Sequence, residues 1–225
     1  MTELSRLEQV TSLLRTAYGS AGFPAINSTW SRLIWVLMGI PAEHAAANTL
    51  LGLLQVAPLS TPRESSVATP GQLVEILAPI PRGPQKASVV RAVAAWWLTQ
   101  FGDALSPDWS AGLQTYRESL RQIRGLGPAT VDELLLFAAE LPVFPVDRTA
   151  LRVAVRHGWL DLPVEDEDAQ SLFVRGVDGS AARLQELSRL LTKVGEAHCG
   201  REPQCDGCPL QSLLGGGAPR DPLSC

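Results

Sequence analysis

The sequence has no long apolar run, no strand pattern and no excess of positive charge. No stretch approaches the roughly 18 consecutive apolar residues that cross a bilayer, so we expect a soluble, cytoplasmic protein without membrane contact. Apolar and polar residues do not alternate convincingly anywhere, which argues against a β-sheet. The chain has 19 Lys and Arg against 23 Asp and Glu, a net charge of −4. Binding to nucleic acid depends on cationic contacts to phosphate, so this balance predicts at most weak affinity for nucleic acid.

What the 225 residues do carry is helical periodicity. Apolar side chains recur at i, i+3, i+4 and i+7 in several segments. Two examples are Trp30, Leu33, Ile34 and Leu37, and Val89, Val93, Trp96 and Trp97. Breaks rich in proline and glycine divide the chain at 22–24, 57–62, 79–84, 102–107 and 141–145. The pattern predicts an all-α fold, with most tryptophans in the core.

The most informative segment runs from Ile123 to Val153 and reads IRGLGPATVDELLLFAAELPVFPVDRTALRV. Gly125 and Gly127 permit positive φ and a close backbone approach, and a helix is expected from about Pro128. The first N–H groups of that helix have no partner within the helix, so the turn can present donors to a phosphate. A Gly-x-Gly corner is also an ordinary helix C-cap and turn.

Asp147 opens a further helix about twenty residues beyond the glycine turn. An aspartate at this position is a good helix N-cap, worth about 1 kcal/mol. A carboxylate can also act as a general acid or base, and both roles are compatible in one residue.

This segment resembles the helix-hairpin-helix and Gly/Pro-Asp signature of the endonuclease III family of DNA glycosylases. Five positions fall in register with it: Gly125, Gly127, Thr130, Val146 and Asp147. The resemblance implies a partner, double-stranded DNA, whose backbone would be held by Arg124, Gly125, Leu126, Gly127, Ala129, Thr130 and Lys86. Arg124 stands where the family usually has proline, and Pro128 where it usually has a basic residue.

Ala129 stands where the family's lysine should be. A bifunctional glycosylase needs an amine to attack the sugar C1′ and form a Schiff base, which alanine cannot do. The chain has only two lysines, Lys86 and Lys193, and neither lies in the hairpin. The resemblance therefore implies a monofunctional enzyme, in which Asp147 stabilises the oxocarbenium-like sugar and helps to activate water.

All four cysteines lie in the last twenty-seven residues, spaced C-x5-C-x2-C-x16-C: Cys199, Cys205, Cys208 and Cys225. Four thiolates at such spacing hold either a [4Fe–4S] cluster or a tetrahedral Zn²⁺, and the spacing alone does not choose. The resemblance favours the cluster, because the family has a C-x6-C-x2-C-x5-C iron–sulfur loop near its C-terminus.

The cysteine spacing departs from the family's loop at the first interval and at the fourth ligand. Leu214 occupies the position of the family's last cysteine, and the flexible run Gly215–Gly217 follows it. We interpret this as a rearranged site in which the tail folds back to deliver Cys225. The alternatives are three cysteines with an outside ligand, or a disulfide pair.

The helix around Leu33 to Leu37 leads, in the family, to a glutamine that enters the gap left by a flipped base. Pro41 occupies that position and cannot form the same hydrogen bonds, although an apolar wedge can still hold a duplex open. Trp35 lies on the helix that leads to this wedge, so both residues are candidates for lesion contacts. The damaged base itself cannot be assigned from the family.

The resemblance also implies two domains with a DNA cleft between them. Residues 25–136 would form a six-helix domain with the hairpin, while residues 1–24 and 137–225 would form the iron–sulfur cluster domain. The resemblance leaves three functions open: a monofunctional, monomeric DNA glycosylase of base excision repair, a non-catalytic relative that recognises damaged or branched DNA, and a bifunctional lyase with an unconventional amine. Pro41, Ala129 and the acidic charge favour the second.

Overall fold

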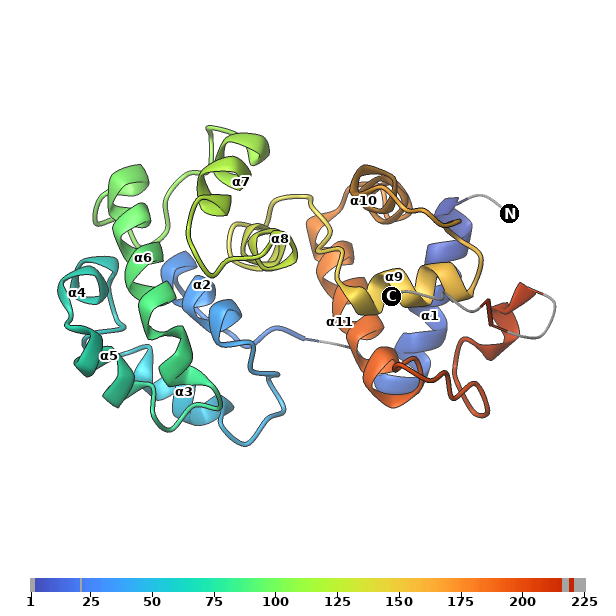
Figure 1. Ribbon diagram of the computed structural model, residues 1–225, viewed down its shortest axis with the longest axis horizontal. Helices are drawn as coiled ribbons and strands as arrows, with labels where there is room; N and C mark the ends of the chain where they lie inside the picture. Colours follow the sequence, from blue (N-terminus) through green and yellow to red (C-terminus); the bar gives the residue numbers. More distant parts are fainter. Residues whose placement is uncertain (1–2, 21, 216–218, 221–225) are drawn as a thin grey trace. The chain divides into compact units, whose positions relative to one another are not determined.

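The computed structural model describes residues 3–20, 22–215 and 219–220, and the chain divides into two compact units. One unit is Phe23–Leu141, and the other combines Met1–Gly22 with Pro142–Cys225. The all-α prediction is confirmed: the described residues contain helices and a single isolated bridge between Cys199 and Pro203, with no strand (Figure 1). None of the described helices is both long enough and apolar enough to cross a bilayer.

The unit Phe23–Leu141 is described throughout and contains seven helices: α2 Thr29–Met38, α3 Ala47–Leu53, α4 Pro62–Val67, α5 Pro70–Ile76, α6 Gly83–Phe101, α7 Leu113–Arg121 and α8 Pro128–Phe137. We expected six, and the difference lies in residues 47–76, which form three short helices. Ala68, after α4, is extended with ψ of 140°, and Thr69 precedes Pro70, which disfavours helical backbone before it. Thr69 and Gln72 then start α5 with a capping box.

The long helix α6 organises this unit. Helices α4 and α5 pack against it, while α2 packs against both α6 and α8 (Figure 1). The indole rings of Trp30 and Trp97 meet edge to face with centroids 5.4 Å apart. The periodic positions of α2 are buried as predicted: Trp30, Leu33, Ile34 and Leu37. Burial of these four side chains fixes the orientation of α2 about its own axis. It therefore also fixes where the loop after Met38 leaves the helix.

The second unit contains α1 Glu3–Tyr18, α9 Arg148–Arg156, α10 Asp166–Arg175, α11 Ala181–Ala197 and the short 3₁₀ turn η1 Gln211–Leu213. Helix α11 packs against α1 and α9, and α1 also packs against α10. Phe144 and Phe173 stack in the core with ring centroids 4.0 Å apart. The packing of α9 against α11 positions the N-terminus of α9 and, through α11, the cysteine loop that follows it.

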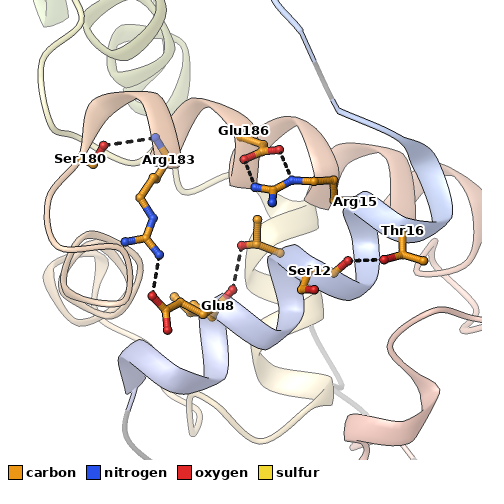
Figure 2. Close-up of polar contacts among 9 residues, drawn as sticks. Glu8, Ser12, Arg15, Thr16, Ser180, Arg183 and Glu186 are labelled. Carbon is orange, nitrogen blue, oxygen red and sulfur yellow. Dashed lines mark hydrogen bonds and ion pairs between the residues drawn. The ribbon is translucent and has the colours of Figure 1, made fainter.

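Charged side chains line the outer seam between α1 and α11 (Figure 2). Arg15 donates two hydrogen bonds to the carboxylate of Glu186, at 2.7 and 2.5 Å, and Arg183 pairs with Glu8 at 2.8 Å. These pairs are partly exposed to solvent, so each contributes at most about 1 kcal/mol. They close the rim of a packing interface whose stability comes from the apolar residues beneath.

Candidate functional site

The predicted hairpin is present, with α7 and α8 joined by residues 122–127. The backbone N–H groups of Gln122 and Ile123 donate to carbonyls in the last turn of α7, and Leu126 N–H donates to Ile123 O at 3.1 Å. Gly125 has φ of +98°, a conformation that other residues rarely adopt. Leu126 is buried beneath the turn and anchors it to the core.

The two glycines of the turn have different roles. A Cβ at Gly125 would stand 2.8 Å from Val89 Cγ2 of α6, so the turn packs directly on that helix. Gly127, by contrast, has φ of −80° and no atom within 4 Å of a Cβ built on it. Only Gly125 therefore uses the positive φ that both were expected to permit, and Gly127 serves as an extended N-cap of α8.

A buried ion pair fastens the two helices of the hairpin. Arg117 Nε of α7 donates to the carboxylate of Asp132 of α8 at 2.7 Å, and Asp132 is 3% exposed. The pair spans α7 and α8 close to the turn, so it fixes the angle at which the turn presents its backbone.

The turn and the start of α8 offer unpaired donors. Among the described residues, no acceptor is bonded to the N–H groups of Gly125, Gly127, Ala129 and Thr130. A groove lies between this turn and α6, and the charged side chains that line it are Arg82, Lys86 and Arg124. Free N–H groups at a helix N-terminus beside three cations suit an anion such as a phosphate.

Lys86 is half-buried at the edge of this groove. Its Nζ donates to Leu37 O at 2.5 Å and to Met38 O at 3.0 Å, the last carbonyl groups of α2. Burial, followed by the nearby charge of Arg82, lowers the pKa of Lys86. Two of the three ammonium donors are thus engaged within the protein, and one is left for a ligand.

The candidate wedge residues lie in contrasting surroundings. Pro41 is exposed, just beyond Gly39, which ends α2 with φ of +62°. Trp35 is 2% exposed and packs edge-on against Phe23 with ring centroids 6.5 Å apart. A contact between Trp35 and a base stays a prediction that requires this packing to open, whereas Pro41 is accessible as it stands.

Asp147 is the N-cap of α9, as the sequence predicted. One carboxylate oxygen, Oδ1, accepts a hydrogen bond from Ala150 N–H at 2.7 Å. The other oxygen has no hydrogen-bond partner among the described residues. Asp147 is half-buried, so this second oxygen is available for a sugar or a water molecule.

Three of the four predicted metal ligands, Cys199, Cys205 and Cys208, line one pocket after α11. All three are free thiols, and burial raises the pKa of Cys208. In the described part of the chain, no three side chains are grouped as ligands of a single metal ion. Cys225 lies outside the described residues. His198 Nδ1 is 3.1 Å from Gln204 O, so this ring supports the loop between the first two cysteines.

Two buried polar atoms near the cysteines, Arg156 Nε and the Tyr18 hydroxyl oxygen, have no hydrogen-bond partner among the described residues. Arg156 is 4% exposed, and its guanidinium donates to Cys199 Sγ at 3.3 Å and to Gly200 O at 2.7 Å. Its Nε has no acceptor, and none of the described carboxylates pairs with this cation. The Tyr18 hydroxyl is likewise buried without a partner, and burial and then Cys208 raise its pKa. A buried cation and a free donor next to three thiols fit an anionic metal–thiolate group.

Arg156 and Tyr18 were not identified from the sequence. Arg156 directly follows the apolar run Val153–Val155 in α9. This position next to buried residues is the one feature of the local sequence that indicates a buried arginine. Tyr18 carries no comparable sign, because a tyrosine at the end of a helix is ordinary.

Comparisons with known proteins agree with the fold. No family model matches the chain. Endonuclease III of Sulfolobus acidocaldarius is 27% identical over 170 residues, which cover 75% of this chain and 63% of that protein. A trapped endonuclease III–DNA covalent intermediate superposes with a TM-score of 0.69 at 18% identity, covering 96% of this chain and 97% of that one. A thermostable thymine-DNA glycosylase gives 0.65 at 14% identity, with 94% of each chain covered.

The matches to curated relatives span between 6% and 63% of those proteins' own lengths, less than two thirds in every case. The structural likeness, in contrast, extends over nearly the whole chain. Together they confirm the resemblance to the endonuclease III superfamily that the hairpin signature predicted.

Proposed function

We propose that this chain, which shares the fold of the endonuclease III superfamily of helix-hairpin-helix glycosylases, is a monofunctional DNA N-glycosylase of base excision repair. The observation that carries the proposal is the Asp147 carboxylate, with one oxygen capping α9 and the other free of partners in the described structure. We further propose that it acts on double-stranded DNA as a cytoplasmic monomer.

The hairpin would hold the DNA backbone. Its turn offers the free N–H groups of Gly125, Gly127, Ala129 and Thr130, and the adjacent groove adds the cations Arg82, Lys86 and Arg124. Such contacts bind phosphate without reading bases. They also supply local positive charge on a chain whose net charge is −4. Pro41, exposed at the end of α2, would act as an apolar wedge.

Hydrolysis would depend on Asp147. As the bond between base and sugar breaks, positive charge develops on the sugar ring, and a carboxylate stabilises that charge. The base leaves with the electron pair of the broken bond and takes up a proton from solvent, while water attacks C1′ and gives its proton to the Asp147 carboxylate. Because Ala129 offers no amine, no Schiff base forms at this position and the abasic strand stays intact.

The cysteine pocket would hold a [4Fe–4S] cluster, with Zn²⁺ as the alternative. Cys199, Cys205, Cys208 and Cys225 would be the ligands, Arg156 would balance their negative charge, and the Tyr18 hydroxyl would donate to a sulfur atom. A bound cluster would supply covalent cross-links within the segment that follows α11.

The experiment that tests the proposal measures release of bases from duplexes that carry single defined lesions. Strand breaks should appear only after heat and alkali, because a monofunctional enzyme leaves an abasic site. Asp147→Asn should abolish release, since Asn retains the cap but not the negative charge. Borohydride trapping of an enzyme–DNA adduct would instead indicate a lyase that uses an unconventional amine.

A second candidate is a DNA-binding relative without catalysis. Ala129 in the place of the family lysine, Pro41 in the place of the base-probing glutamine and the acidic net charge favour it. Measurable binding to lesion-bearing or branched DNA, together with no base release from any substrate, would select this candidate over the enzyme.

A further inference from the structure

An open groove lies between α10 and the loop that follows α9. Its volume is about 330 Å³, which falls within the range of roughly 300–1,000 Å³ that is usual for ligand pockets. One wall is a single face of α10, formed at i, i+4 and i+7 by Asp168, Leu172 and Arg175. The other wall is the loop, and its lining residues are Trp159, Leu160, Asp161 and Val164.

The aromatic side of this groove is fixed by contacts within the protein. The backbone N–H of Trp159 donates to Ala154 O at 2.8 Å, and its indole lies beside the ring of His157 with centroids 5.2 Å apart. Leu172 is 3% exposed and belongs to the core, whereas Leu162 of the same loop is 48% exposed. An aromatic ring that is already fixed loses little conformational freedom on binding, so Trp159 is a suitable anchor for an apolar side chain of a partner.

The rim of the groove is acidic. The segment 161–168 contains no Lys or Arg and five carboxylates, those of Asp161, Glu165, Asp166, Glu167 and Asp168. Taking these five negative charges from the net charge of −4 leaves the rest of the chain at +1, so this segment accounts for the acidity of the whole protein. Asp161 pairs with Arg220, and none of the other four carboxylates pairs with a described cation. Such a rim repels nucleic acid and attracts a cationic partner.

Part of this acidity has a local role. Asp166, Glu167 and Asp168 lie in the first turn of α10, where negative charge stabilises a helix. That role is common to all three, but only Asp168 also lines the groove. Asp161 shows how the rim receives a cation, because the guanidinium of Arg220 donates to its carboxylate at 2.5 Å.

We propose that this groove docks a partner protein through a short segment in which a Lys or Arg adjoins an apolar side chain. The cation would lie at the end formed by Asp161 and Asp168, and the apolar side chain would pack against Trp159 and Leu160. Arg175 is seven residues beyond Asp168, about 10 Å along the helix, so about three extended residues span the groove and a second cation is disfavoured at the far end. Docking of this kind is independent of the proposed catalysis.

The test measures binding of three fluorescein-labelled hexapeptides to the full chain by fluorescence anisotropy. The first peptide has an arginine and a lysine, then two leucines, then two serines. The second has serines in place of the leucines, and the third has acidic residues in place of the two cations. The protein variants are Asp168→Asn, Arg220→Ala and the control Glu167→Gln. Glu167 is also exposed and lies in the same helical turn as Asp168, but it does not line the groove.

The wild type is expected to bind the first peptide saturably and the other two at least about tenfold more weakly, because each lacks one of the two kinds of contact. Asp168→Asn should weaken binding of the first peptide by up to about fivefold, the usual value of an exposed ion pair. Arg220→Ala should strengthen it by a similar factor, since the Asp161 carboxylate loses its internal partner. Glu167→Gln should change it by less than about twofold, through screened charge alone.

Three results would overturn the proposal. Equal affinity for the first and second peptides, or equal weakening by Asp168→Asn and Glu167→Gln, would reduce the interaction to general attraction by the acidic segment. No saturable binding of any peptide up to about 1 mM would remove the docking surface altogether. Self-association of the chain in sedimentation, lost in Asp168→Asn, would assign the groove to a second copy of this protein. Base release by the same preparations reports on the glycosylase separately.

Discussion

The ammonium of Lys86 lies 2.5 Å from the carbonyl oxygen of Leu37, forty-nine residues earlier in the chain. Together with the bond to Met38 O, this contact satisfies the last carbonyl groups of α2 and ties that helix to the start of α6. The exposed Pro41 follows only three residues after Met38. Lys86 therefore joins two segments that the proposed function places against DNA: the wedge at Pro41 and the start of α6, which lines the phosphate groove.

Replacing Lys86 should loosen the end of α2. Lys86→Met keeps most of the apolar stem but removes both hydrogen bonds to the helix carbonyls. We expect a loss of about 1 kcal/mol in the free energy of unfolding, because hydrogen bonds from a charged donor are stronger than neutral ones. Urea unfolding measures the loss, and Lys86→Arg, which keeps a cation, should recover part of it. A variant as stable as the wild type would show that the contact is incidental.

The same residue should make stability depend on pH in the alkaline range. Burial lowers the pKa of Lys86 in the folded chain below its ordinary value of 10.5, so between the two values the unfolded chain binds more protons. Stability contributed by Lys86 therefore rises as pH increases through this window. The difference in unfolding free energy between wild type and Lys86→Met should grow from neutral pH toward 10.5. A difference that stays flat would contradict the lowered pKa.

The two glycines of the hairpin give a matched pair of variants. Gly125→Ala places a side chain at φ of +98° and 2.8 Å from Val89 Cγ2, so it should cost at least about 1–2 kcal/mol of stability. Gly127→Ala meets neither obstacle and should change stability by less than about 0.5 kcal/mol. If the turn approaches phosphate closely, both variants should weaken DNA binding, by roughly tenfold or 1.4 kcal/mol, measured by fluorescence anisotropy. Unchanged binding by the stable Gly127→Ala would argue against this backbone contact.

The features that the sequence predicted correctly are mostly ones that neighbouring residues determine. The cap at Asp147 bonds Ala150, three residues away, and the positive φ of Gly125 reflects the glycine itself. The buried stripe of α2 follows from its own periodicity. Each of these features is fixed within one or two helical turns, so the order of the residues is sufficient to reveal it.

Contacts between distant segments were not predictable in the same way. Arg156 and Cys199 are forty-three residues apart, and Arg220 N–H donates to a carbonyl sixty-four residues earlier in the chain, that of Arg156. The division of residues 47–76 into three helices was missed because the wide break at 57–62 was expected and the stop at Ala68 was not. Such features depend on packing between elements, which periodicity does not describe.

Removing only the arginine of the Arg117–Asp132 ion pair in the hairpin should lower the free energy of unfolding. Arg117→Met removes the cation that pairs with the buried carboxylate of Asp132, which we expect to cost about 3 kcal/mol. The double variant Arg117→Met, Asp132→Leu removes the carboxylate as well and should regain much of that loss. Chemical denaturation of the two variants and of Asp132→Leu alone completes the cycle. A loss below about 0.5 kcal/mol for Arg117→Met would mean that other partners satisfy Asp132.

Asp147 combines a cap with a proposed catalytic charge, and three substitutions separate the two. Asp147→Asn and Asp147→Ser retain a side-chain oxygen for Ala150 N–H, so their stability should stay close to that of the wild type, whereas Asp147→Ala should lose about 1 kcal/mol. All three lack the carboxylate, so base release under single-turnover conditions should fall by at least about a hundredfold in each. Urea unfolding and base release are measured on the same preparations. Full activity in Asp147→Ser would assign the residue to the cap alone, because the serine hydroxyl can accept the helix bond but cannot balance positive charge on the sugar.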